Sequence, residues 1–186
     1  YDLCKRLKRD LVVEGKSETI LADTGVKLMS KLHQLYSGTV KFESGNSAVI
    51  DLSKANFIKW KFEGDKIGVF YKFKEEYNAL KRVFGKDLCD NLSDFDSGRF
   101  KVIALQIVSG REGISLKNAD YICFYNIDFS ATSYWQARDR MTTKDRKHNK
   151  IYWVFAKNGI EGKIYKAVSN KKDYTLSHFR ADLISL

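Results

Sequence analysis

The chain has 186 residues, of which 44% are hydrophobic and 13% aromatic. This length corresponds to one domain with a small attachment, and this composition excludes wholesale disorder. No run approaches the ~18 consecutive apolar residues that a membrane-spanning helix needs, so we expect no membrane partner. The first residues are not typical of a signal or transit peptide, and Tyr1 stands where a complete protein has Met, so we expect a piece of a longer cytoplasmic protein.

The charge balance points to a polyanionic partner. There are 33 Lys and Arg residues against 23 Asp and Glu residues, a net charge of +10. Between Arg138 and Lys172 stand eleven basic and three acidic residues, so most of the excess lies in one quarter of the chain. A lysine-rich coding bias is the alternative, but a basic surface that binds nucleic acid is the favoured interpretation.

Proline and cysteine usage indicate the type of fold and the redox compartment of the protein. Proline is absent, which favours continuous helices and strands with short turns. The three cysteines, Cys4, Cys89 and Cys123, are widely spaced without a Cys-x-x-Cys pair, which argues against a zinc site or a disulfide framework. A reducing, intracellular compartment fits this pattern, and Cys123 is expected in the core.

The first third of the chain predicts a peripheral extension over residues 1–65. Apolar residues at helical spacing predict a helix from Thr24 to Tyr36, which Ser37 and Gly38 end. Residues 39–42 and 48–51 predict a short hairpin. Ser53 is then expected as the N-cap of a helix that runs to Lys61.

From residue 66 the pattern changes to alternating strands and helices. Strands are expected at 66–71, 101–106, 121–125 and 151–155, with helices over 73–84, 131–141 and about 160–168. Because these strands are apolar throughout, we expect an α/β fold with a parallel sheet covered on both faces over 66–172, and a final helix over 173–186. Ligands of such sheets bind beyond the carboxyl ends of the strands. These are the loops after Tyr71, Gln106, Tyr125 and Phe155.

Two of these loops carry candidate chemistry. The loop after the second strand reads Ser-Gly-Arg-Glu-Gly-Ile-Ser-Leu over 109–116, and its two glycines allow close approach of a phosphate or a partner domain. An ordinary strand-to-helix turn is the alternative. After the third strand, Gln136 and Arg140 share one helical face, from which Arg140 could stabilise a transferring phosphoryl group. A solvated basic helix is the alternative there.

In this order and spacing the segments resemble motifs V and VI of superfamily-two helicases. The form Gln-Ala-x-Asp-Arg at 136–140 is most similar to the Swi/Snf branch of DNA translocases, including phage-encoded members. Residues 32–38, Val69 to Phe73 with Glu76, and residues 158–164 resemble further elements of that branch. The resemblance covers about residues 24–168.

The resemblance implies a second, RecA-like motor lobe that shares an ATP site with an N-terminal RecA-like lobe of the same protein. In that family ATP and Mg²⁺ are held mainly by the first lobe, which is absent from this sequence, and both lobes grip DNA, with RNA not excluded. It implies catalytic roles for Arg140 at the γ-phosphate and Gln136 beside it. The expected ATP-facing residues are Gly110, Arg111, Glu112, Gly113 and Arg140, and the expected nucleic-acid contacts are Lys72, Ser109, Ser115, Lys144, Arg146 and Lys147.

The sequence departs from the family in two ways. Gly15-Lys16-Ser17 looks like the end of a Walker A loop, but Asp10 occupies the first glycine position, and no Asp-Glu box exists. We therefore expect that this chain alone does not hydrolyse ATP. Where the family usually has a second motif VI arginine, seven residues after Gln136, this chain has Thr143.

Other singled-out residues have structural interpretations beside functional ones. Tyr134 and Trp135 could stack on a base, but packing of their helix against the sheet is favoured. Trp153 is expected in the core, and Trp60, between Lys59 and Lys61, is ambiguous. His33, His148 and His178 form no catalytic pattern. The basic run over 5–9 suits either phosphate contact or the solvated face of a short helix.

Three functional hypotheses remain. The first is the C-terminal lobe of an ATP-dependent helicase or translocase. The second is a catalytically degenerate module of the same fold that binds nucleic acid or protein without ATP hydrolysis, with Thr143 as the sign of lost catalysis. The third is an unrelated doubly wound domain, such as a methyltransferase-like or nuclease-like fold, although no Gly-x-Gly-x-x-Gly loop or nuclease carboxylate cluster is present.

Overall fold

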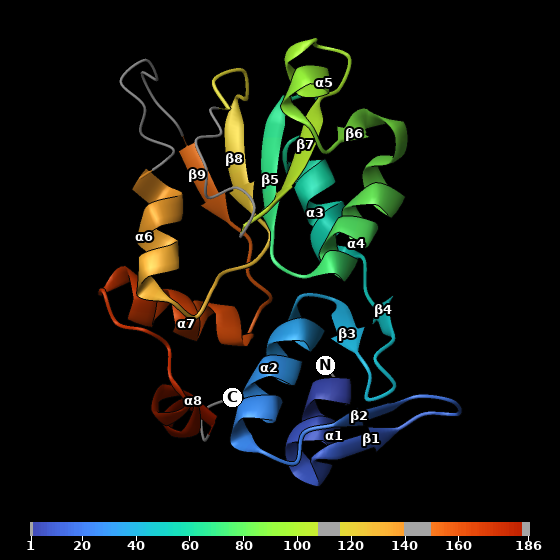
Figure 1. Ribbon diagram of the computed structural model, residues 1–186, viewed down its shortest axis with the longest axis vertical. Coiled ribbons are helices and arrows are strands. Elements are labelled where there is room, and N and C mark those ends of the chain that lie inside the picture. The colour runs from blue at the N-terminus through green and yellow to red at the C-terminus, as the bar shows by residue number, and fades with distance from the viewer. Residues whose placement is uncertain (1, 108–115, 140–149, 184–186) are drawn as a thin grey trace.

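The computed structural model describes residues 2–107, 116–139 and 150–183. Its centre is a five-stranded sheet in the order β6-β7-β5-β8-β9, in which every pair of neighbours is parallel (Figure 1). In the central strand, Val69 pairs with Ala104 on one side and Cys123 on the other. The strands are β5 (Ile67–Tyr71), β6 (Leu88–Cys89), β7 (Val102–Gln106), β8 (Tyr121–Phe124) and β9 (Lys150–Trp153).

Alternate residues of each strand enter two separate apolar cores, which explains why the strands are apolar throughout. Val69 and Cys123 face the core that α3 (Ser53–Lys61) and α4 (Lys74–Phe84) cover. Phe70 and Phe124 face the opposite core, which α5 (Leu92–Asp96) and α6 (Ala131–Asp139) cover. A short 3-10 turn, η1 (Gly85–Asp87), follows α4. The predicted α/β fold class, with the doubly covered parallel sheet expected of a RecA-like lobe, is confirmed.

The remaining elements gather beyond the carboxyl edge of the sheet (Figure 1). A third core joins Leu7 and Leu32 near the start of the chain to Ile160 and Phe179 near its end. The N-terminal extension is therefore packed against the last two helices of the chain. These elements are α1 (Asp2–Asp10), β1 (Val12–Glu14), β2 (Thr19–Leu21), α2 (Gly25–Tyr36), β3 (Thr39–Lys41), β4 (Ser47–Val49), α7 (Ile160–Ser169) and α8 (Leu176–Leu183).

Most predicted elements are confirmed within a few residues. The Thr24 hydroxyl accepts a hydrogen bond from the backbone N–H of Lys27 at 3.2 Å and so caps α2. β3 and β4 form the expected antiparallel hairpin. Gly85 ends α4 with a φ of 56°, a left-handed conformation that favours glycine. All three cysteines are buried and free, and Cys123 lies in the core as expected.

Two expectations need correction, and three short strands are missing from the prediction. Ser53 is the first residue of α3 rather than its N-cap. Leu52 holds the N-cap position without a side-chain hydrogen bond, and the Asp51 carboxylate accepts the Ser53 backbone N–H at 2.8 Å. Asp173 and Tyr174 precede α8 because they bind the start of the α6 segment instead of continuing a helix. The two-residue strand β6 and the β1–β2 hairpin lie outside the predicted elements.

Several sequence expectations stay predictions. These are the division of the chain at residues 65 and 172 and the intracellular compartment. Among the described residues, no helix is both long and apolar enough to cross a bilayer.

Gly15-Lys16-Ser17 lies in the turn between β1 and β2, where the Gly15 N–H bonds the Glu18 carbonyl oxygen at 2.8 Å. A Walker A loop is followed by a helix, so this turn does not have that geometry.

Candidate functional site at the carboxyl edge of the sheet

The carboxyl ends of β5, β7 and β8 lie together, as expected for a parallel sheet. The Gln106 side-chain amide donates a hydrogen bond to the Lys72 carbonyl oxygen at 3.2 Å, and the Ile107 N–H bonds the Tyr71 carbonyl oxygen at 2.8 Å. The Tyr125 N–H bonds the Phe70 carbonyl oxygen at 2.8 Å. Three of the four loops chosen from the sequence therefore begin at one edge, where open α/β sheets bind ligands.

Lys72 forms an ion pair at this edge. Its ammonium donates to the Asp128 carboxylate at 3.0 Å and lies 4.9 Å from the centroid of the Phe129 ring. Burial alone would raise the pKa of the Asp128 carboxyl, but the Lys72 charge and the N–H groups of Phe129 and Ser130 outweigh burial and lower it. The ion pair ties the loop after β5 to the loop after β8, and the predicted nucleic-acid contact of Lys72 stays a prediction.

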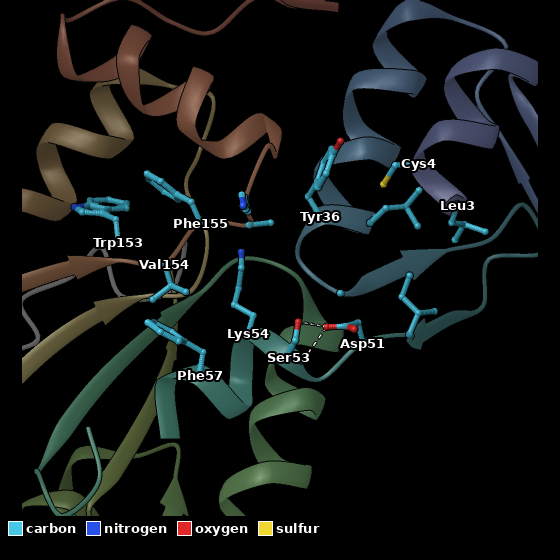
Figure 2. A pocket seen from close by; sticks show the side chains of 15 residues that line it. Leu3, Cys4, Tyr36, Asp51, Ser53, Lys54, Phe57, Trp153, Val154 and Phe155 are labelled. Carbon is cyan, nitrogen blue, oxygen red and sulfur yellow. Dashed lines mark hydrogen bonds between the residues drawn. The ribbon is translucent and has the colours of Figure 1, made fainter. Parts of the chain in front are cut away.

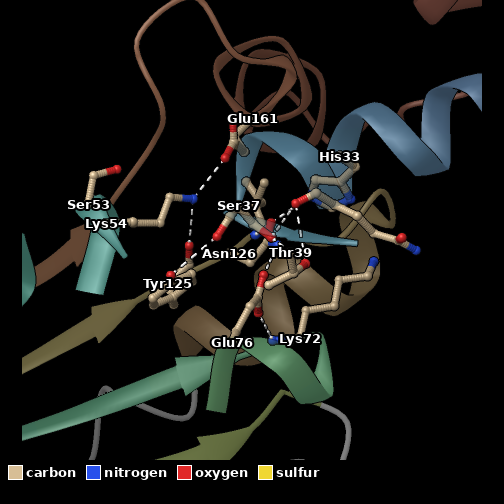
Figure 3. A network of polar contacts seen from close by, with 12 residues as sticks. His33, Ser37, Thr39, Ser53, Lys54, Lys72, Glu76, Tyr125, Asn126 and Glu161 are labelled. Carbon is tan, nitrogen blue, oxygen red and sulfur yellow. Dashed lines mark hydrogen bonds and ion pairs between the residues drawn. The ribbon is translucent and has the colours of Figure 1, made fainter. Parts of the chain in front are cut away.

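A chain of buried polar side chains lies beneath this pair (Figure 3). Asn126 Oδ1 is 2.5 Å from His33 Nε2 and also accepts the backbone N–H of Ile127 at 2.8 Å. The Asn126 amide donates to the Glu76 carboxylate, whose other oxygen accepts the N–H groups of Lys72 and Phe73 at 2.7 and 3.0 Å. His33 therefore donates through Nε2, which leaves its buried Nδ1 without a partner among the described residues.

Burial controls the protonation of His33 and Glu76, the two ends of this hydrogen-bonded series of side chains. It lowers the pKa of His33 well below the usual range, and the nearby Lys72 charge adds to the effect, so the imidazole is neutral at pH 7. Burial also raises the pKa of Glu76, against the opposing effects of the Lys54 charge and the hydrogen bonds that the carboxylate accepts. Glu76 caps the start of α4 as an acidic residue in its first turn.

A second buried pair joins α3 to α7. The Lys54 ammonium donates to Glu161 at 2.8 Å and to the Tyr125 carbonyl oxygen at 3.0 Å, and the side chains are 6% and 0% exposed (Figure 3). The second oxygen of Glu161 has no hydrogen-bond partner among the described residues. A Cβ at position 159 would lie 2.3 Å from that oxygen, so the carboxylate packs where only Gly159 leaves room.

The helix that carries Gln136 is fixed at its first turn and along one face. The Ala131 N–H donates to the Asp173 carboxylate at 2.8 Å, and the Tyr174 N–H donates to the Phe129 carbonyl oxygen at 2.8 Å. The Trp135 indole N–H donates to the Val168 carbonyl oxygen at 3.0 Å. These bonds hold the start of α6 against the α7–α8 segment, so its direction is set by tertiary contacts.

The aromatic residues of α6 pack within the fold, as the sequence analysis favoured over stacking on a base. Tyr134 is buried, with its ring 5.1 Å from that of Trp153. Trp153 in turn stacks on Phe124 at 4.0 Å. Gln136, in contrast, is exposed on α6. The side chain with an expected catalytic role is therefore free to meet a ligand or partner.

Most predicted site residues lie outside the described residues. Of the predicted set, the structure places only Gln136 and Lys72, the first on α6 and the second after β5. The predicted role of Arg140 depends on whether its side chain faces the glycine turn at 110–113. Both segments lie outside the described residues. The residues outside the described part are Ser109, Gly110, Arg111, Glu112, Gly113, Ser115, Arg140, Lys144, Arg146 and Lys147.

Sequence reasoning missed the buried polar residues. His33, Asn126, Lys54 and Glu161 are distant in sequence, and no spacing rule connects them. Glu76 alone had a local signal, because an acidic residue at the third position of a helix is typical of a capping box. Among the described residues, no group of three or more His, Cys, Asp and Glu side chains could hold a metal ion.

A pocket of about 840 Å³ opens beside this edge, between the N-terminal helices and the end of β9 (Figure 2). Aromatic side chains form much of its wall, and Asp51, Ser53 and Lys54 supply polar groups. Its volume lies in the range of small-molecule sites. The aromatic residues are Tyr36, Phe57, Trp153 and Phe155.

Comparison with protein families identifies one segment. Residues 84–143 match the family model described as the helicase conserved C-terminal domain. The match begins at the end of α4, includes β7, β8 and α6, and contains both candidate loops chosen from the sequence. A comparison with curated proteins gave no match.

Three solved structures illustrate the matches of this chain. The C-terminal part of the Fun30 ATPase domain is 18% identical, with a TM-score of 0.48, over 66% of this chain and 43% of that chain. The C-terminal domain of the DEAD-box protein Dbp5 is 20% identical, with a TM-score of 0.46, over 64% of this chain and 78% of that one. The Hef helicase domain of Pyrococcus furiosus is 20% identical, with a TM-score of 0.45, over 61% of this chain and 27% of that chain.

Proposed function

We propose that this chain is the C-terminal motor lobe of an ATP-dependent helicase or DNA translocase of the Swi/Snf-like branch. The observation that carries the proposal is the match of residues 84–143 to the helicase C-terminal family model. The two segments chosen from chemistry, 109–116 and 136–140, both fall inside that match. The net charge of +10 agrees with a nucleic-acid partner.

In this proposal the chain positions a guanidinium for an ATP held by the N-terminal lobe. ATP supplies the phosphoryl group that is transferred to water, and the resemblance to superfamily-two helicases assigns Mg²⁺ mainly to the N-terminal lobe. Gln136 is exposed on α6, four residues before Arg140 in the sequence. The hydrogen bonds of Ala131 and Trp135 keep this helix in place, which would preorganise Gln136 for a role beside the phosphates.

The test uses the gene product that contains this chain together with its N-terminal lobe. Nucleic-acid-stimulated ATP hydrolysis is measured for the wild type, Arg140→Ala and the control Arg138→Ala. Arg138 is exposed on the same helix, with its guanidinium 5.0 Å from the Trp135 ring. Loss of an arginine at the γ-phosphate is expected to reduce the rate about 10³-fold or more, whereas the control stays near wild type.

The outcomes separate the hypotheses. Full activity of Arg140→Ala would remove Arg140 from the assigned role. A wild-type gene product that binds nucleic acid but hydrolyses no ATP would favour the degenerate adaptor, with Thr143 as the mark of its lost catalysis. The 186-residue chain alone is expected to hydrolyse no ATP in the same assay.

A further inference from the structure

An exposed aromatic cluster lies on α3, remote from the candidate motor residues in sequence. Trp60 is 69% exposed and Phe57 45% exposed, and their ring centroids are 5.7 Å apart. The inward face of the same helix places Ala55 and Ile58 in the core under the sheet. Tryptophan is seldom left this exposed, and adjacent exposed aromatics mark binding surfaces.

The positive charge of α3 favours a polyanionic binding partner. α3 contains Lys54, Lys59 and Lys61 and no acidic residue. The Lys59 ammonium bonds the Val83 carbonyl oxygen at 2.8 Å, and Lys61 is exposed next to Trp60. Flat aromatic faces beside lysines match the bases and phosphates of a single strand, because every base offers a π face and every linkage a negative charge. An acidic peptide would satisfy the lysines but would leave the two exposed rings without a stacking partner.

The cluster continues into the pocket. Phe57 also lines the pocket of about 840 Å³, whose wall includes Trp153 and Phe155 (Figure 2). Lys54 reaches this pocket, and its two hydrogen bonds use two of the three ammonium protons. The Asp51 carboxylate supplies an acceptor at the same wall. Aromatic sides with one donor and one acceptor suit a nucleobase, whose ring stacks and whose edge carries both kinds of group.

We propose that α3 and this pocket bind single-stranded nucleic acid. One base stacks on Trp60, the neighbouring base enters the pocket beside Phe57, and the exposed Lys59 and Lys61 neutralise the phosphates. The surface adds to the proposed function a strand contact that needs neither ATP nor the N-terminal lobe. Its failure would therefore leave the assignment of Arg140 untouched, and the reverse also holds.

The experiment measures binding of a fluorescently labelled single-stranded DNA 12-mer to the full chain by anisotropy, over a series of salt concentrations. Trp60→Ala is expected to weaken binding about tenfold, the size of one lost base–aromatic stack. Trp60→Phe keeps a π face and should bind within about threefold of wild type. The control is Val26→Ala, which removes an exposed apolar side chain (55% exposed) from α2 and should change nothing.

Two competition measurements decide the partner class. A duplex of the same sequence should compete more weakly than the single strand, because its bases are already stacked. Equal affinities of wild type and Trp60→Ala would overturn the proposal. Competition by a polyglutamate peptide equal to that of the oligonucleotide would also overturn it and show a surface for acidic proteins. Circular dichroism confirms that each variant is folded.

Discussion

His33 shows how a polar residue can be fully buried and still be satisfied at one nitrogen. Its Nε2 donates to Asn126, while its Nδ1 has no partner among the described residues. The rings of Phe73 and Phe129 lie against the imidazole, with centroids 5.3 and 4.8 Å away. Protonation would place a charge in this apolar site, near the Lys72 ammonium, which is why the pKa of His33 is lowered.

The lowered pKa predicts a loss of stability in acid. Below about pH 6.5, the ordinary pKa of histidine, the unfolded chain binds a proton that the folded His33 does not bind. Stability attributable to His33 is therefore complete above pH 6.5 and falls as the pH falls below it, by at most ~1.4 kcal/mol per pH unit. The measurement is the free energy of unfolding in urea between pH 7.5 and 5, for wild type and His33→Gln.

The glutamine variant is the reference because it cannot titrate and keeps an N–H donor for Asn126. Glu76 has a raised pKa and contributes a pH dependence of opposite sign above its ordinary pKa of 4.5, but both proteins contain it, so it cancels in the difference. The advantage of wild type over the variant should shrink towards acid. A difference that is independent of pH would show that His33 is not held neutral.

At the scale of elements, the central strand β5 depends on a missing side chain. A Cβ at Gly68 would lie 2.5 Å from Leu116 Cδ1, and Leu116 is only 2% exposed. Leu116 is the first described residue after the segment 108–115. The close approach therefore ties the end of the predicted glycine loop to the middle of the sheet.

Gly68→Ala is expected to lower the free energy of unfolding by ~1–3 kcal/mol, because the buried leucine must leave its place. The penalty should shrink when Leu116→Ala is also present, since the clash partner is then gone. Gly162→Ala is the matched control: it lies inside α7, where a Cβ meets nothing within 4 Å, and helix propensity favours alanine by ~0.5–1 kcal/mol. Urea unfolding of the four variants and wild type gives the comparison. An equal penalty with and without Leu116 would contradict the assigned contact.

Most elements could be predicted because their signals are local. The helix 25–36 shows apolar residues at helical spacing after a threonine cap, and the four longer strands show apolar runs between turns. β6 could not be found, because a two-residue strand exists only by pairing with β7. The start of α3 could not be placed from residue type alone, because aspartate and serine both favour the N-cap position and Leu52 occupies it instead.

At the scale of the whole molecule, the Lys54–Glu161 pair connects residues 107 positions apart. It joins α3, from the predicted extension, to α7 and to the end of β8 through the Tyr125 carbonyl oxygen. Both charges are buried, so each depends on the other for compensation. The ion pair therefore joins the extension to the sheet domain, and Lys54 would lack its partner if the extension stood alone.

Lys54→Met is expected to cost ~3–5 kcal/mol in the free energy of unfolding, because Glu161 would remain buried and uncompensated. Adding Glu161→Gln should recover at least half of that loss, since the second change removes the stranded charge. Chemical unfolding followed by both tryptophan fluorescence and circular dichroism measures the effect. Additive losses in the double variant would argue against a coupled pair.

The sequence by itself determined the α/β class and most of the longer helices and strands. Its two candidate segments both lie within residues 84–143, the match to the helicase C-terminal family model. These follow from periodicity and from short motifs, which are properties of neighbouring residues. Only the tertiary structure decided the buried chain His33–Asn126–Glu76, the Lys54–Glu161 pair and the pocket beside Phe57. Each of these joins distant segments, and burial of a polar group is favourable only where the fold brings its partner within hydrogen-bond distance.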